Sequence, residues 1–153
     1  MTITRRALLA LALTIPVAGT IMRPALAKET EVYAPGGVAL GGYDPVAYFA
    51  EGRAVKGRDQ NRLMWRGVVW RFASREAMEA FEMNPSAYAP QYGGYCAYAL
   101  SKGAVSASDP EVFTVHDGRL YLNYSSEIRA IWREDIDGNV ALADGYWPAV
   151  LGR

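Results

Sequence analysis

Residues 88–100 read YAPQYGGYCAYAL, and this stretch concentrates more unusual residue choices than any other part of the chain. It holds Cys96, the only cysteine of the protein, directly after a glycine pair and a tyrosine. Paired glycines let the backbone adopt positive φ or approach another group closely. We expect the glycines to turn the chain so that Cys96 points into a pocket, whose walls are predicted to be Tyr92, Gly93, Gly94, Tyr95 and Tyr98.

A single cysteine in an oxidising compartment has no partner for an internal disulfide. It either packs as a small apolar group or acts as a soft metal ligand or reactive thiol. His116 is the only histidine and is the candidate second ligand, although solvent exposure is the default for a residue at a strand end. One cysteine and one histidine do not complete a mononuclear zinc site of the usual kind. Copper or iron completed by tyrosine, methionine or carboxylate groups, or by a second chain, remains open.

Motifs of familiar enzymes are missing. The sequence has no G-x-S-x-G, H-E-x-x-H or C-x-x-C, and no lysine follows the glycine pair as in a phosphate-binding loop. A nucleophilic pair of Cys96 and His116 is formally available, but two unique residues do not make a catalytic constellation. We therefore expect a protein that is not an enzyme.

The first 27 residues have the pattern of an export signal. Arg5-Arg6 precedes an apolar run that is shorter than a spanning helix requires, and Ala25-Leu26-Ala27 resembles a cleavage site. The arginine pair indicates the twin-arginine route, and hence a periplasmic or otherwise exported protein with no membrane segment after cleavage. Removing residues 1–27 takes away three of 16 Lys+Arg and none of 16 Asp+Glu, which leaves a formal charge of −3. With no basic stripe, nucleic-acid binding is not expected.

The remaining chain predicts an α+β fold. We expect a mobile segment at residues 28–37 and one compact domain at 38–153, without internal repeats. Short antiparallel strands should combine with three to four helices. Strands or hairpins are predicted at 38–40, 63–72 and 112–124, with turns at Arg66-Gly67 and Asp117-Gly118. Helices are predicted at 46–49, at 75–83 after Ser74, to 133 after Ser125, and as a broken helix at 140–150.

Four motifs in this order resemble the YHS-domain family of small exported bacterial proteins. They are GGYDPVAYF at 41–49, AVKG at 54–57, PQYGGYCAYAL at 90–100 and DGRLYLNYS at 117–125. Related modules occur in metal-transporting ATPases, and some members are described as selenoproteins, so the resemblance implies that Cys96 carries metal or redox chemistry. Those modules place a cysteine soon after an Asp-Pro pair, whereas Val46 and Ala47 follow Asp44-Pro45 here.

The sequence thus predicts an exported metal-binding or metal-handling accessory protein. Its cofactor would be copper first, or another transition metal ion, held by Cys96 and His116, and its partner would be another metal-handling protein. Two further interpretations stay open. One is a thiol redox protein in which Cys96 forms sulfenic acid or a mixed disulfide. The other is a protein-interaction module that uses a tyrosine surface.

Overall fold

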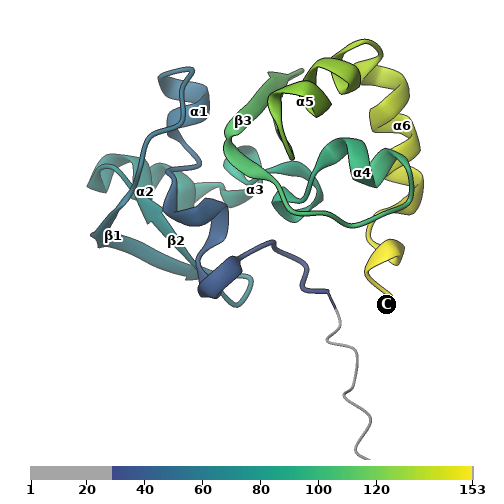
Figure 1. The fold of residues 1–153 in the computed structure, drawn as a ribbon. Coiled ribbons are helices and arrows are strands. Elements are labelled where there is room, and N and C mark those ends of the chain that lie inside the picture. The colour runs from purple at the N-terminus through teal and green to yellow at the C-terminus, as the bar shows by residue number, and fades with distance from the viewer. Residues whose placement is uncertain (1–28, 153) are drawn as a thin grey trace, which may run out of the picture.

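The computed structural model describes residues 29–152, so the predicted export signal at residues 1–27 lies outside the described part of the chain. The predicted α+β class is confirmed: the structure combines two small antiparallel sheets with short helices (Figure 1). None of the helices in the described range has the length and apolar character needed to cross a membrane. The strands are β1 (Arg58–Trp65), β2 (Val68–Phe72), β3 (Asp109–His116) and β4 (Arg119–Asn123).

Residues 29–152 contain six α-helices, more than the three to four expected, because several short turns of helix give little signal in the sequence. They are α1 (Ala47–Ala50), α2 (Arg75–Met83), α3 (Pro85–Tyr88), α4 (Ala97–Ser101), α5 (Ser126–Arg133) and α6 (Ile136–Tyr146). The same residues also include four 3₁₀ segments: η1 (Pro35–Gly37), η2 (Ala39–Gly42), η3 (Gln91–Gly94) and η4 (Ala149–Leu151).

Both hairpins and both serine caps follow the predictions. The turn residues Arg66-Gly67 and Asp117-Gly118 all have positive φ, as two-residue hairpin turns require. The Ser74 hydroxyl accepts a hydrogen bond from the Ala77 amide, and the Ser125 hydroxyl accepts one from the Ile128 amide. These bonds satisfy amides that the first helical turn leaves unpaired.

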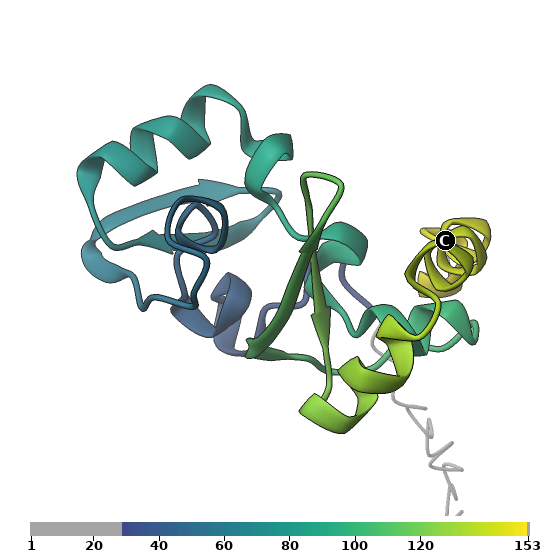
Figure 2. The same cartoon turned by 90° about the horizontal axis from the view of Figure 1, so that it is seen from above.

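An internal repeat is present, although none is expected from the sequence patterns above. The order 3₁₀ segment, short helix, hairpin, capped helix occurs first as η2-α1-β1-β2-α2 and again as η3-α4-β3-β4-α5. The capping serines, the hairpin turns and the buried aromatic residues Phe81 and Trp132 are each separated by 51 residues. Figure 2 shows the two hairpins, each with its own helices. The repeat places Cys96 at the position that Asp44 holds in the first half.

Strand β4 separates two hydrophobic cores. Because successive strand side chains point to opposite faces, Leu120 and Leu122 pack into the first core while Tyr121 packs into the second. An ordinary hairpin strand buries one face, yet residues 120–123 are all buried. The first core is built mainly from Tyr48, Trp70, Phe72 and Phe81, and the second from Tyr92, Tyr95, Leu100 and Trp132.

The segment before η2 differs from its prediction. Residues 38–40 do not form a strand, because Leu40 and Gly41 have φ of 54° and 58°, which lies in the left-handed region. Only Val38 makes a bridge, to Val69. Val32, in the segment expected to be mobile, is 3% exposed and belongs to the first core.

Asp44 joins α1 to the end of β2. Its carboxylate accepts hydrogen bonds from the amides of Val46 (2.8 Å) and Ala73 (2.9 Å), and the residue is 1% exposed. Burial raises the pKa of Asp44 above its ordinary value of 3.8, and the amides of Ala73 and Val46 partly oppose this shift.

A raised native pKa means that the folded protein holds a proton which the unfolded chain releases. The stability due to Asp44 is therefore fully present below pH 3.8 and is lost as the pH rises through the native pKa. We expect the wild type to lose stability relative to the Asp44→Asn variant as the pH rises from about 3 to 7. Urea unfolding at a series of pH values measures it, and a difference that moves the other way would contradict the raised pKa.

Candidate functional site

Cys96 lies at the junction of η3 and α4, with its backbone fixed on both sides. Its amide donates a hydrogen bond to the Ser106 carbonyl (3.1 Å), its carbonyl accepts one from the Leu100 amide (3.1 Å), and it bridges to Leu122 of β4. The residues after it form helix α4, and Cys96 is the residue that precedes its first turn.

The sulfur of Cys96 is enclosed. The residue is 1% exposed, and the Asn123 side-chain amide donates a long hydrogen bond of 4.0 Å to Sγ. A mainly carbon-lined hollow of about 220 Å³ lies over it, formed by Cys96, Tyr98, Ala99, Ser106, Tyr124 and Ile128. A thiol with such surroundings packs as a small apolar side chain, and its burial weighs against the redox interpretation.

Two of the predicted pocket tyrosines belong to the second core. The Tyr92 hydroxyl donates to Asp144 (2.9 Å), and the Tyr95 hydroxyl donates to the Thr30 carbonyl (2.9 Å). Burial raises the pKa of both phenols, and the Asp144 carboxylate adds to the effect at Tyr92. Both hydroxyls are therefore protonated near neutral pH, which makes them poor metal ligands, and neither residue offers an exposed surface for a partner.

The other predicted pocket residues have separate roles. Gly93 and Gly94 have φ of 61° and 86° and do turn the chain ahead of Cys96. The Gly93 carbonyl accepts a hydrogen bond from the Tyr33 amide (2.9 Å), so this turn also holds the N-terminal segment. Tyr98 is half-buried, lines the hollow over Cys96, and carries the Lys102 ammonium 4.9 Å from its ring centroid.

Cys96 and His116 are not brought together as a joint metal site. Along β4, Cys96 bridges to Leu122, while His116 pairs with Arg119 at the tip of the hairpin. Three residues of strand separate these positions by about 10 Å. Among the described residues, the group of possible metal ligands that contains His116 does not include Cys96, so the predicted pair does not form one cluster.

His116 instead lies beside two carboxylates. Its Nε2 is 2.9 Å from Asp137 Oδ1 and 3.6 Å from Asp117 Oδ2. One donor atom from each of the three residues lies within 4.8 Å of the others, which is a spacing that fits an ion. The His116 side chain is 30% exposed, whereas those of Asp117 and Asp137 are 85% and 87% exposed. The site is thus open to solvent.

Local structure brings Asp137 to the hairpin tip. Asp135 caps α6 through a hydrogen bond from the Gly138 amide to its Oδ1 (3.0 Å). The buried Asn139 side chain donates to the Trp132 carbonyl (3.0 Å) and so ties α6 to α5. Asp137 lies between these two fixed points, in the first turn of α6. Sequence patterns single out neither aspartate as a ligand, because Asp117 has the role of a turn residue and Asp137 is 21 residues from the histidine.

Comparison of the chain with protein-family models, with curated proteins and with solved structures finds no match. The resemblance to the YHS-domain family therefore stays a prediction that depends on the four motifs themselves.

Proposed function

We propose that this protein is an exported, non-enzymatic YHS-like domain that binds a divalent transition-metal ion through His116, Asp117 and Asp137. The observation that carries the proposal is the convergence of one imidazole nitrogen and two carboxylate oxygens within 4.8 Å. The metal-binding function is the one inferred from the sequence. His116 remains a ligand, and Asp117 and Asp137 take the place of Cys96.

The donor atoms favour a divalent ion over Cu(I). Imidazole nitrogen suits zinc, copper, iron and nickel, whereas Cu(I) prefers thiolate and thioether sulfur. Among divalent first-row metals, affinity for a given nitrogen and oxygen site is generally greatest for Cu²⁺. Copper therefore remains the first candidate, now as Cu²⁺, with zinc second.

The open geometry suits temporary binding and transfer of the ion. Three side chains leave coordination positions for water or for ligands from another protein. The aspartates are exposed to water, whose high dielectric constant weakens their attraction for the ion. The bound ion should therefore exchange readily. A protein of the same compartment that accepts or supplies the ion is the partner we propose, and the twin-arginine pattern at residues 1–27 supports export.

Titration of the full-length chain with Cu²⁺ by calorimetry tests the metal site. We expect one ion per chain and an electron paramagnetic resonance spectrum with a nitrogen ligand. His116→Ala removes the only imidazole of the protein, so it should abolish the nitrogen signal and weaken binding at least about tenfold, or 1.4 kcal/mol. Asp137→Asn should also weaken binding, because an amide oxygen carries no charge.

Two control variants separate this site from other sources of affinity. Glu134→Gln removes an exposed carboxylate close in sequence to Asp137 that is not part of the cluster, so Cu²⁺ affinity should not change. Cys96→Ala should also bind Cu²⁺ as the wild type does. Retention of wild-type affinity by His116→Ala would refute the proposal. Loss of affinity in Cys96→Ala would show that the Cys96 thiol is a metal ligand.

A further inference from the structure

The tip of the first hairpin adjoins a pocket that none of the proposed metal ligands lines. The pocket, of about 180 Å³, opens between the β1–β2 hairpin, the η3 segment and the residue that follows α6. Three of the four tryptophans of the chain line it: Trp65 and Trp147, which are half-buried and can contact a ligand, and Trp70, which is 1% exposed. The volume is close to the roughly 150 Å³ of a cavity that holds benzene, so the pocket fits a molecule with one ring.

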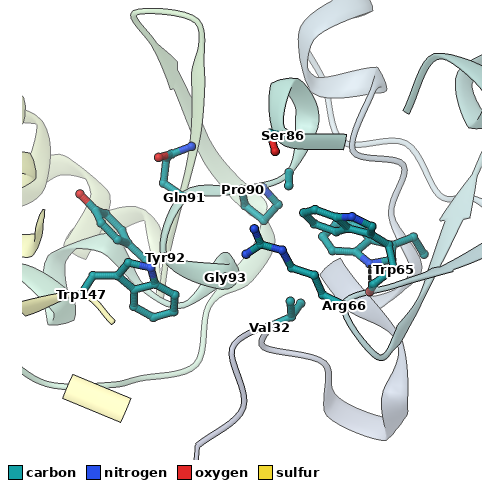
Figure 3. Close-up of a pocket in the computed structure, with 11 residues that line it drawn as sticks. Val32, Trp65, Arg66, Ser86, Pro90, Gln91, Tyr92, Gly93 and Trp147 are labelled. Carbon is teal, nitrogen blue, oxygen red and sulfur yellow. Dashed lines mark hydrogen bonds between the residues drawn. The ribbon is translucent and has the colours of Figure 1, made fainter. Parts of the chain in front are cut away.

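Arg66 is the only charged residue among the eleven that line this pocket. Figure 3 shows its guanidinium reaching from the Trp65 side toward the middle of the pocket, with Tyr92 and Trp147 on the opposite side. The guanidinium carbon lies 4.5 Å from the Trp65 ring centroid, a cation–π distance that orients the group. Gln91 and Ser86 add neutral polar side chains at the rim.

The guanidinium has donors to spare for a ligand. One nitrogen of Arg66 pairs with Glu31 Oε1 at 2.9 Å, with both side chains 40% or more exposed. A guanidinium carries five N–H donors, and an exposed ion pair contributes little net stability. A carboxylate that enters the pocket can therefore share Arg66 with Glu31 or replace it.

We propose that this pocket binds a small aromatic carboxylate, with its ring against the tryptophan walls and its carboxylate on Arg66. Arginine forms paired hydrogen bonds with a carboxylate in one plane, and indole rings offer flat surfaces on which an aromatic ring stacks. The pocket includes none of the metal ligands, so a negative result for the metal site does not bear on this proposal.

Benzoate is the probe, and the indole N–H signals of the full-length chain are the readout in nuclear magnetic resonance. Benzoate should shift the signals of Trp65 and Trp147 along one saturable curve. The Trp132 signal should not move, because that residue is fully buried in the second core. Acetate, which lacks the ring, and benzyl alcohol, which lacks the charge, should each bind at least about tenfold more weakly (1.4 kcal/mol).

Variants test the role of Arg66. Arg66→Gln should raise the dissociation constant for benzoate at least about tenfold, and Arg66→Lys should have an intermediate effect because it keeps the charge but loses the planar fork. Arg75→Gln, which removes an exposed ion-paired arginine on α2, is the matched control and should bind as the wild type does. Equal binding of acetate or of benzyl alcohol and benzoate would overturn the proposal, as would equal shifts of all four indole signals. The ligand comparison on the wild type holds even if Arg66→Gln does not fold.

Discussion

Replacing Gly93 by alanine is expected to destabilise the protein by about 2.5–5 kcal/mol. Gly93 has φ of 61°, and a β-carbon there would lie 2.9 Å from the Glu31 carbonyl carbon and still closer to its oxygen. The left-handed backbone alone costs an L-residue roughly 1–2 kcal/mol. To relieve the clash the N-terminal segment must move away, which exposes Val32 and adds about 1.5–3 kcal/mol.

Gly67→Ala is the matched control for Gly93→Ala. Gly67 has φ of 76°, but no atom lies within 4 Å of the place that a β-carbon would take, so only the backbone cost of roughly 1–2 kcal/mol should remain. Urea unfolding of both variants measures the difference, and hydrogen exchange at the Tyr33 amide reports whether its bond to Gly93 is lost. Equal stabilities of the two variants would show that the N-terminal segment does not depend on the close approach at Gly93.

The hairpins and capped helices are predictable because their signals are local. Asp117-Gly118 between alternating apolar residues defines a turn, and Ser74 and Ser125 precede helices with buried aromatic residues. The predicted strand at 38–40 is wrong, since apolar composition says nothing about the left-handed φ of Leu40. The repeat does leave a trace in the sequence: GGY occurs at 41–43 and again at 93–95, with turns, caps and aromatic residues following at nearly the same spacing.

The candidate sites are harder to predict because they depend on contacts across the fold. The sequence singles out His116 by its rarity, but nothing near it in sequence points to Asp137. Cys96 also stands out because it is rare, but its position in the repeat gives a structural reason for the residue. The equivalent residue of the first half, Asp44, is also buried and joins the equivalent elements, α1 and the end of β2, so a small buried side chain at this junction is common to both halves.

The repeat also relates the two proposed sites to each other. Trp65-Arg66-Gly67 and His116-Asp117-Gly118 occupy the same place in the two hairpins, at a spacing of 51 residues. Arg66 and Asp117 both have left-handed φ, 50° and 48°, although neither is glycine. Non-glycine residues adopt this conformation infrequently. Hairpin tips lie outside the cores, so the two copies could acquire opposite charges and different ligands without a cost to the shared fold.

Phe81→Ala is expected to reduce the free energy of unfolding by about 3–5 kcal/mol. Phe81 is fully buried, and its ring centroid lies 5.6, 5.1 and 5.2 Å from those of Trp65, Trp70 and Phe72. Alanine leaves a cavity that these large rings cannot fill by small movements, and it loses the edge-to-face contact with Trp65. Phe81→Leu, which keeps most of the volume, should lose clearly less.

Met83→Ala on the same helix is the control for Phe81→Ala. Met83 is 87% exposed, so its replacement should change the free energy of unfolding by no more than about 0.5 kcal/mol. Urea or thermal unfolding of the three variants gives the comparison. Because Trp65 contacts Phe81 and also lines the pocket proposed for benzoate, any folded Phe81→Leu protein should also bind benzoate more weakly. A Phe81→Ala protein as stable as Met83→Ala would mean that the aromatic cluster does not hold the first hairpin against α2.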